Sequence, residues 1–137
     1  MWIELTPDLI LKRISAPEKN ALNSAAKDIE QEDVLAEVCG LVAPDWRGVL
    51  ARYVTLDPRP LALPDELMIH ILADFRYRAW TRLPNMKTFL DERRVAEWER
   101  ANKVRDTLLH TYTIEPPEGV PPSGNVPSIT NPPSLFD

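Results

Sequence analysis

Prolines bound the segment LPDELMIHILADFRYRAWTRLPN, residues 63–85, and apolar residues dominate it, so it indicates the centre of the fold. Pro64 suits the first position of a helix, and Asp65 and Glu66 suit its first turn. On a helical wheel the apolar residues of 64–83 cover roughly 240°, too wide an arc for a helix lying on a surface. These residues are Leu67, Met68, Ile69, Ile71, Leu72, Ala73, Phe75, Ala79, Trp80 and Leu83. The sequence therefore predicts a central helix over 64–83, packed on most of its sides.

The same stretch places arginines among aromatic rings, a pattern that also occurs where a protein binds a nucleic-acid strand. Phe75 and Trp80 fall within the apolar arc, so their rings are expected to point into the protein, which disfavours stacking on bases. Arg76 falls within this arc as well, where a guanidinium needs a carboxylate partner or an interface. The remaining stripe carries His70, Asp74, Tyr77 and Thr81, flanked by Arg78 and Arg82.

His70 and Asp74 are spaced i, i+4, as a catalytic dyad or two metal ligands would be. We expect instead a hydrogen bond on the helix surface, with Asp74 also pairing with Arg78. No third ligand lies nearby at helical spacing, and His110, the other histidine, is far along the chain. The sequence therefore predicts a protein that is not an enzyme and holds no metal or cofactor.

Two helices are predicted before the central one by their start signals. The Thr-Pro pair at 6–7 is typical of an N-cap and first helical residue, opening a helix through Ile14. Ser15 and Glu18 form a capping box for a second helix that ends near Ala26.

A longer helical pattern covers residues 34–53, and Pro44 within it predicts a kink or two abutting helices. A proline-rich connection over 55–64 then leads into the central helix. Thr88 and Asp91 are predicted as the cap pair of the last helix.

No alternating strand pattern and no internal repeat occur in the sequence. We therefore expect an all-α fold, a small bundle of four to five helices over about residues 6–112. Its core is expected to include Ile71, Leu72, Phe75 and Trp98.

The charge balance disfavours a general polyanion binder. With 16 Lys and Arg against 21 Asp and Glu, the 137-residue chain has a formal net charge of −5, whereas nucleic-acid-binding domains are usually basic. Cys39 is the one cysteine, so no disulfide within the chain is possible. The first residues do not resemble a signal peptide, and no apolar run approaches the roughly 20 residues of a membrane span. We expect a soluble chain of the intracellular type.

The composition changes after residue 114, so we expect a helical domain over 1–114 and an arm over 115–137. The arm holds seven of the 14 prolines and no Lys or Arg, a composition that favours extended, polyproline-type structure over a core of its own. A stiff arm with a few apolar residues suits docking on a partner. The residues predicted to bind that partner are Val126, Ile129, Leu135 and Phe136.

In order and spacing, the chain resembles the small neck proteins of Mu-like phages and prophages, the head–tail connector or adaptor class. The resemblance covers roughly residues 3–118 and is carried by a short N-terminal helix, a charged last helix with a tryptophan, and three motifs. The motifs are VLARY at 49–53, PRPLALPDEL at 58–67 and RYR at 76–78. The chain departs from the family pattern at Pro44-Asp45-Trp46 and in the position of Asp74.

The resemblance implies a structural virion protein without catalysis. Such a protein forms a homo-oligomeric ring of about twelve subunits beneath the portal protein, contacts a tail or stopper protein, and lines the channel through which DNA passes. It is assembled in the host cytoplasm and resides in the neck of the virion. Arginines are favoured at contacts between subunits. The candidates for such contacts are Arg76, Arg78, Arg82 and Arg94.

A second interpretation belongs to another class of protein. The segment PSLFD, residues 133–137, resembles the Leu-Phe ends of peptides that bind sliding clamps. The chain would then be a soluble monomeric adaptor whose C-terminal segment is a short linear binding motif.

Overall fold

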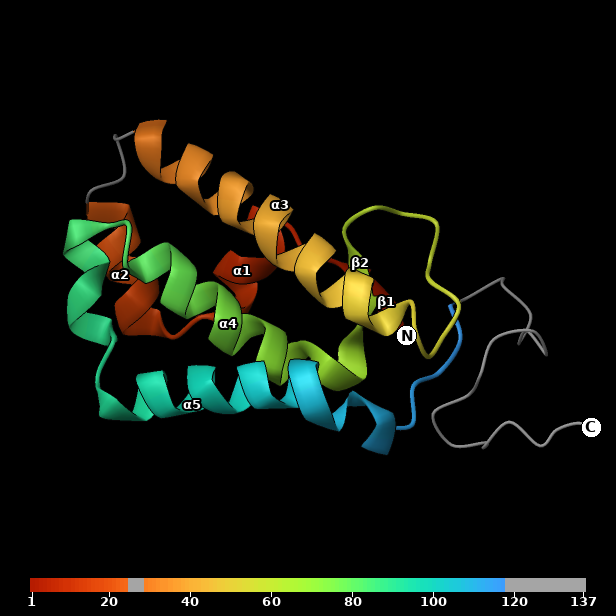
Figure 1. The fold of residues 1–137 in the computed structure, drawn as a ribbon. Helices are drawn as coiled ribbons and strands as arrows, with labels where there is room; N and C mark the ends of the chain where they lie inside the picture. Colours follow the sequence, from red (N-terminus) through yellow and green to blue (C-terminus); the bar gives the residue numbers. More distant parts are fainter. Residues whose placement is uncertain (25–28, 118–137) are drawn as a thin grey trace, which may run out of the picture.

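The computed structural model describes residues 1–24 and 29–117 and confirms a small all-α fold (Figure 1). Five α-helices carry the fold, together with shorter helical turns and a two-stranded ladder. Their bounds are β1 Trp2–Glu4, α1 Pro7–Arg13, α2 Ala16–Ser24, α3 Ile29–Leu50, β2 Ala62–Pro64, the 3₁₀ turn Asp65–Leu67, α4 Met68–Trp80, the 3₁₀ turn Pro84–Phe89, α5 Glu92–Lys103, the π-turn Val104–Leu108 and the 3₁₀ turn Leu109–Thr111.

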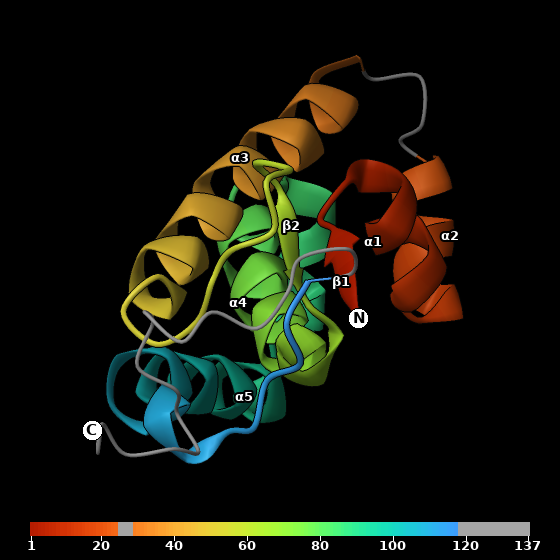
Figure 2. The same cartoon turned by 90° about the vertical axis from the view of Figure 1, so that its right-hand side faces the viewer.

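Helix α4 is the centre of the molecule, as the sequence predicted. Figure 2 shows α3, α5, α1 and α2 arranged around it, and α4 packs against both α3 and α5. Phe75, Ile71 and Trp80 are fully buried, and Leu72 is nearly so. The rings of Phe75 and Trp80 meet edge to face, with their centroids 6.0 Å apart.

Two residues of α4 have the opposite exposure to the one that the helical wheel predicted. Ile69, placed in the apolar arc, has 75% of its surface exposed. Asp74, placed on the polar stripe, is completely buried. The reason in the second case is that tryptophan and arginine side chains surround its carboxylate, which the wheel of a single helix does not show.

The start of α4 also differs from the prediction. Pro64 was expected at the first helical position but is the last residue of β2, and a 3₁₀ turn separates it from α4, which begins at Met68. The strands pair antiparallel, with Trp2 opposite Pro64 and Glu4 opposite Ala62. Three-residue strands are too short to give an alternating pattern, so the sequence did not reveal this ladder.

Helix α3 runs through Pro44 as one continuous helix, so of the two predicted alternatives, a kink or two abutting helices, the second is wrong. Pro44 has no N–H to donate to the carbonyl of Gly40. Both residues are exposed, so water can satisfy that carbonyl. The opposite side of α3 is buried and includes Cys39, whose pKa burial raises to about 12.

The caps of the other helices show which local signals held. The side-chain oxygen of Thr6 accepts a hydrogen bond from Leu9 N–H at the start of α1, as predicted. Helix α5 begins after Asp91, whose carboxylate accepts from Arg94 N–H. Thr88 lies in the preceding 3₁₀ turn, so the predicted cap pair of Thr88 and Asp91 is wrong.

Trp98 of α5 is not part of the main core, contrary to the prediction. It is half-buried and stacks on Tyr77 of α4, with the ring centroids 3.7 Å apart and the planes 8° from parallel. The pair forms the outer part of the contact between α4 and α5, while Ala101 and Val104 on the inner side are fully buried.

Candidate functional site

The arginines of α4 and α5 were the main candidates for function, and the structure places most of them on buried carboxylates of the same chain. Arg76 binds Glu18 of α2 through its Nε, at 3.2 Å from Oε2, and through its NH2, at 3.3 Å from Oε1. The expectation that a guanidinium within the apolar arc reaches a carboxylate is thus confirmed. Its partner is a residue that the sequence marked only as a helix cap.

Glu18 is the centre of a cluster that joins α2, α4 and α5. Its carboxylate is 1% exposed and accepts a 2.7 Å hydrogen bond from the indole Nε1 of Trp80. Arg94 of α5 lies 3.7 Å away. The predicted capping box is also present, since Glu18 accepts from Ser15 N–H at 3.0 Å and donates its own N–H to the Ser15 hydroxyl at 3.3 Å.

The charge state of this cluster follows from opposing effects. Burial alone would raise the pKa of Glu18, but hydrogen bonds from Trp80 and Ser15 and the positive charge of Arg76 outweigh it, so the pKa lies below its ordinary value. Burial lowers the pKa of Arg76, and the nearby Glu18 carboxylate opposes this effect. At neutral pH the cluster is therefore a buried ion pair.

Asp74 is the centre of a second cluster, which joins α4 to α3 and to the π-turn after α5. The indole Nε1 of Trp46 donates to Asp74 Oδ2 at 3.0 Å. Arg78 donates from Nε to Oδ1 at 2.9 Å, which confirms the predicted i, i+4 pair, and Arg105 donates to Oδ2 at 3.2 Å. All donors converge on a carboxylate with no exposed surface.

The arginines around Asp74 extend to the protein surface. Arg78 also binds the exposed Asp45 of α3 at 2.7 Å, and Arg105 binds the exposed Asp106 at 3.0 Å. Burial would lower the pKa of Arg78, but its hydrogen bonds to Asp74 and Asp45 raise it above the ordinary value. The guanidinium of Arg105 also lies 5.8 Å from the centre of the Trp46 ring, within the range of a cation–π contact.

The predicted surface hydrogen bond between His70 and Asp74 is wrong. Asp74 points into the protein, and His70 makes its hydrogen bond through Nε2 to the hydroxyl of Tyr112, 3.1 Å away. Burial, and next the charge of Arg100, lower the pKa of His70, so its imidazole is neutral at neutral pH. Among the side chains that the structure describes, those of residues 1–22 and 34–117, no group of three or more His, Cys, Asp or Glu is placed to hold a metal ion.

Of the four arginines predicted at subunit contacts, only Arg82 lies largely in solvent. It pairs with the exposed Glu37 of α3 at 2.8 Å. Arg94 is mostly covered and binds Glu97 at 3.1 Å, in addition to its approach to Glu18. Arg76 and Arg78 belong to the two buried clusters, so all four have intramolecular partners, and a role between subunits stays a prediction.

The start of the predicted arm packs on its own domain. The carbonyl of Glu115 accepts a 2.8 Å hydrogen bond from Trp2 Nε1, and Glu115 N–H donates to Glu66 at 2.8 Å. Pro117 is buried. Residues 115–117 are thus bound to β1 and to the 3₁₀ turn before α4 of the same chain. Val126, Ile129, Leu135 and Phe136 lie outside the described residues.

Sequence reasoning missed Trp46, Trp80 and Arg105 as partners of buried carboxylates. A usable signal was present, because a buried tryptophan N–H requires an acceptor. Two buried tryptophans near two acidic residues therefore could have indicated both clusters, although a single sequence does not say which residues pair.

No helix in the described part of the chain has the length and apolarity needed to cross a membrane. Comparison of the chain with protein-family models, with curated proteins and with solved structures found no match.

Proposed function

We propose that this chain is a structural head–tail connector of a Mu-like phage or prophage, a subunit of a ring that lies beneath the portal and surrounds the DNA channel. The proposal begins from the three sequence motifs of the resemblance. These fall on adjoining parts of the fold, since VLARY covers the end of α3, PRPLALPDEL covers β2 and the 3₁₀ turn, and RYR lies in α4. In this function the chain acts by assembly and performs no catalysis.

The observation that carries the proposal is the internal pairing of the arginines. Arg76, Arg78 and Arg105 are bound to the buried Glu18 and Asp74, so these cations are not offered to a polyanion. The chain as a whole carries a net charge of −5. A wall of this charge can surround DNA without binding it tightly, because like charge keeps the polyanion mobile.

The direct test is assembly with portal protein. The chain is purified and studied by native mass spectrometry, alone and after addition of portal rings from Mu-like phages, and complexes are imaged by electron microscopy. We expect a closed ring bound to the portal. A chain that remains monomeric, does not bind any portal, and instead binds a sliding clamp through Leu135 and Phe136 would favour the linear-motif adaptor.

A second test concerns DNA. We expect no binding of short duplexes at micromolar concentration in about 0.15 M salt, because the arginines of α4 are already paired. Tight binding that is lost on Arg78→Glu with Arg82→Glu would contradict this expectation. Arg82→Glu alone separates loss of DNA contact from disruption of the Asp74 cluster.

The role of the arm in assembly can be tested by deletion. Removal of residues 119–137 is expected to leave helicity and thermal unfolding nearly unchanged, because the buried core lies within residues 2–109 of the described chain. The same deletion is expected to block incorporation into particles. Normal incorporation of the shortened chain would contradict an assembly role for the arm.

A further inference from the structure

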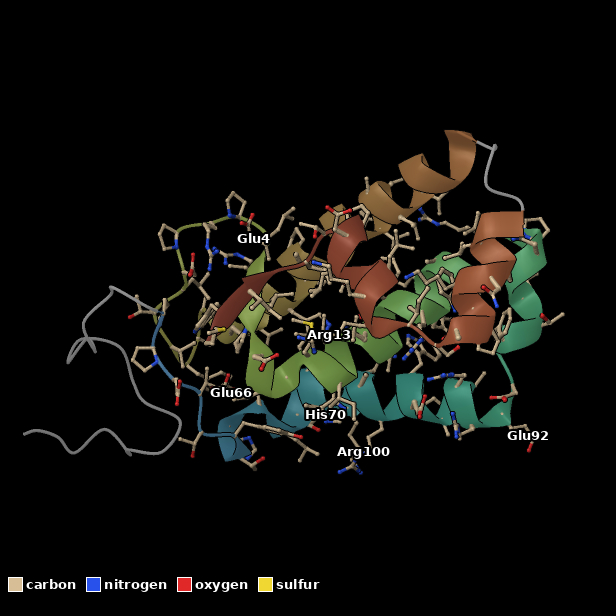
Figure 3. All side chains as sticks on the ribbon, turned by 180° about the vertical axis from the view of Figure 1, so that it is seen from behind. Glu4, Arg13, Glu66, His70, Glu92 and Arg100 are labelled. Carbon is tan, nitrogen blue, oxygen red and sulfur yellow. The ribbon has the colours of Figure 1, made fainter. Side chains whose placement is uncertain are left out.

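The exposed side of α4 contains a groove that the contacts within the domain do not fill. Ile69 projects from this side with 75% of its surface exposed, although most of α4 is buried. A hollow of about 430 Å³ lies on its α1 side and another of about 390 Å³ on its α5 side. We call the two hollows and the ridge between them the Ile69 groove. Figure 3 shows this face, with Arg13 from α1, His70 from α4 and Arg100 from α5.

The two hollows differ in charge. The hollow toward α1 is lined by Arg13 and Arg76 on the basic side and by Asp65 and Glu66 on the acidic side, so it is balanced. The hollow toward α5 has an excess of positive charge. Its lining consists of Ile69, His70, Ala73, Arg76, Arg94, Glu97 and Arg100.

Arg100 gives this second hollow its available charge. Arg76 and Arg94 are already bound to Glu18 and Glu97, whereas no ion pair joins Arg100 to another residue among 1–22 and 34–117, the residues whose side chains the structure describes. The neutral His70 adds no charge. A ligand suited to the groove therefore has apolar side chains to cover Ile69 and Ala73 and a carboxylate to meet Arg100.

The chain itself contains a segment of this chemistry. Residues 118–137 include no Lys or Arg, and their two charged residues, Glu118 and Asp137, are both acidic. Leu135 and Phe136 directly precede Asp137, so two large apolar side chains and a carboxylate lie within three residues. We propose that the Ile69 groove binds the segment 126–137 of a second copy of this chain, with Leu135 and Phe136 against Ile69 and Asp137 at Arg100.

The position where the arm leaves the domain favours a second copy over the arm of the same copy. Glu115 is bound to Glu66, which itself lines the groove, so the arm starts at the groove's edge. Ile69 and Ala73 lie within about 10 Å of Glu66 along the helix axis. A polyproline-type chain of 20 residues would span about 60 Å, several times the distance from Glu66 to this part of the groove. That length, with the proline pairs at 121–122 and 132–133, suits the groove of a neighbouring copy better than the groove of the same copy.

This contact would join different surfaces of successive copies. An arm from one copy in the groove of the next is a heterologous contact, and repetition of such a contact closes into a ring when the rotation allows it. The inference therefore deepens the ring proposed above, and rests on it for the choice of a second copy, by naming the surface and the segment that meet.

The binding test uses a labelled peptide of residues 126–137 and the full-length chain carrying Leu135→Ser and Phe136→Ser, so that its own arm does not compete. Fluorescence anisotropy is expected to show saturable binding. Ile69→Asp or Arg100→Glu in the protein is expected to weaken it by about tenfold or more. Both side chains are exposed, so these changes leave the core intact.

Three controls sharpen this measurement. Leu41→Asp on α3, another exposed apolar residue, is expected to leave peptide affinity unchanged. A peptide with Asp137→Lys is expected to bind the Arg100→Glu protein better than the unchanged peptide does. A scrambled peptide is expected not to bind. The proposal would be overturned if the scrambled peptide bound equally well or if the Ile69→Asp protein kept full affinity. It would also be overturned if the unchanged peptide showed no binding up to about 1 mM.

Measurements at several protein concentrations show whether the arm in the groove comes from a second copy or from the same copy. The unmodified full-length chain, when dilute, is expected to bind the peptide as well as the Leu135→Ser, Phe136→Ser chain does, and to exclude it only as protein concentration rises. Exclusion at every concentration would mean that each arm occupies its own groove, which overturns the choice of partner. Because the assay needs no portal, peptide binding without ring formation would count against the proposed function alone, and ring formation without peptide binding against this inference alone.

Discussion

The Glu18 and Asp74 clusters have the same kinds of partner, but their carboxylates are positioned in different ways. Each buries one carboxylate beneath a tryptophan N–H and two arginines, and each ties α4 to other helices. Glu18 is positioned by a local signal, the capping box with Ser15, whereas Asp74 is positioned only by residues distant in sequence, apart from Arg78. A helix cap can therefore serve at the same time as an anchor between helices.

The clusters also differ in what remains when the carboxylate is removed. Arg78 and Arg105 each have a second, exposed carboxylate, Asp45 and Asp106. Arg76 has no carboxylate other than Glu18 within ion-pair distance among the described side chains of residues 1–22 and 34–117. We therefore expect removal of the Glu18 carboxylate to destabilise the fold more than removal of the Asp74 carboxylate.

The largest effect is expected for Glu18→Ala. It leaves Arg76 and the Trp80 N–H buried without their acceptor and removes the cap, so the free energy of unfolding should fall by about 4 kcal/mol. Urea denaturation followed by circular dichroism measures this loss. Glu97→Ala, which removes a partly exposed partner of Arg94, is the matched control and should cost less than about 1 kcal/mol.

Asp74→Ala is expected to cost about 3 kcal/mol, less than Glu18→Ala, because both of its arginines keep a carboxylate at the surface. The same denaturation experiment provides the comparison. Should Asp74→Ala prove the more damaging variant, the secondary partners Asp45 and Asp106 would have no protective role. In that case the double variant Asp74→Ala, Asp45→Ala should lose no more unfolding free energy than the sum of the two single variants.

Acid is expected to weaken the stabilisation that the Glu18 cluster provides. Since the folded pKa of Glu18 is lowered from 4.5, its ionised form stabilises the fold above that value, and the contribution is lost as pH falls through the folded pKa. The stability difference between the unchanged chain and Glu18→Gln should therefore stay constant from about pH 7 to about pH 4.5 and shrink as the pH falls further. A difference that stayed constant below about pH 4.5 as well would show that Glu18 acts through shape and not charge.

The tryptophan donors should matter less than the carboxylates. Trp80→Phe and Trp46→Phe each remove one hydrogen bond but leave the arginines in place, so each should cost about 1–2 kcal/mol. Trp46→Phe also alters the ring beneath Arg105. If either variant destabilised the fold as much as loss of its carboxylate, the indole and not the ion pair would be the main element of that cluster.

The smallest effect is expected for Arg82→Ala. Its pair with Glu37 is exposed on both sides, so the free energy of unfolding should change by less than about 0.5 kcal/mol. Thermal unfolding at low and high salt provides the measurement. A clearly larger loss would place Arg82 with the structural arginines of the same stretch.

Much of the fold could be predicted from the sequence because its signals are local. The cap at Thr6, the capping box at Ser15 and the burial of Phe75 within an apolar arc all depend on neighbouring residues, and all were confirmed. The short ladder of β1 and β2 could not be predicted, since it joins residues 58 or more positions apart through three-residue strands.

The clusters could be predicted only in part. Arg76 within the apolar arc indicated a carboxylate, but nothing local identified Glu18 as that residue. Asp74 and Ile69 exchanged their expected exposures because helical wheels sort residues by type, whereas burial depends on what the surrounding helices present. Trp46 and Arg105 cover Asp74 from two other elements, and no element covers Ile69 in the described part of the chain.

Labelling of the buried Cys39 can measure how often the core of the protein opens. As the chain's one thiol, held in the core with a pKa raised to about 12, it reacts with a thiol reagent only when α3 separates from its neighbours. The labelling rate then reports how often the interior opens, residue-specifically and without any added probe. Comparison of the labelling rate of a free subunit with that of an assembled one would measure how much assembly slows the opening of the core.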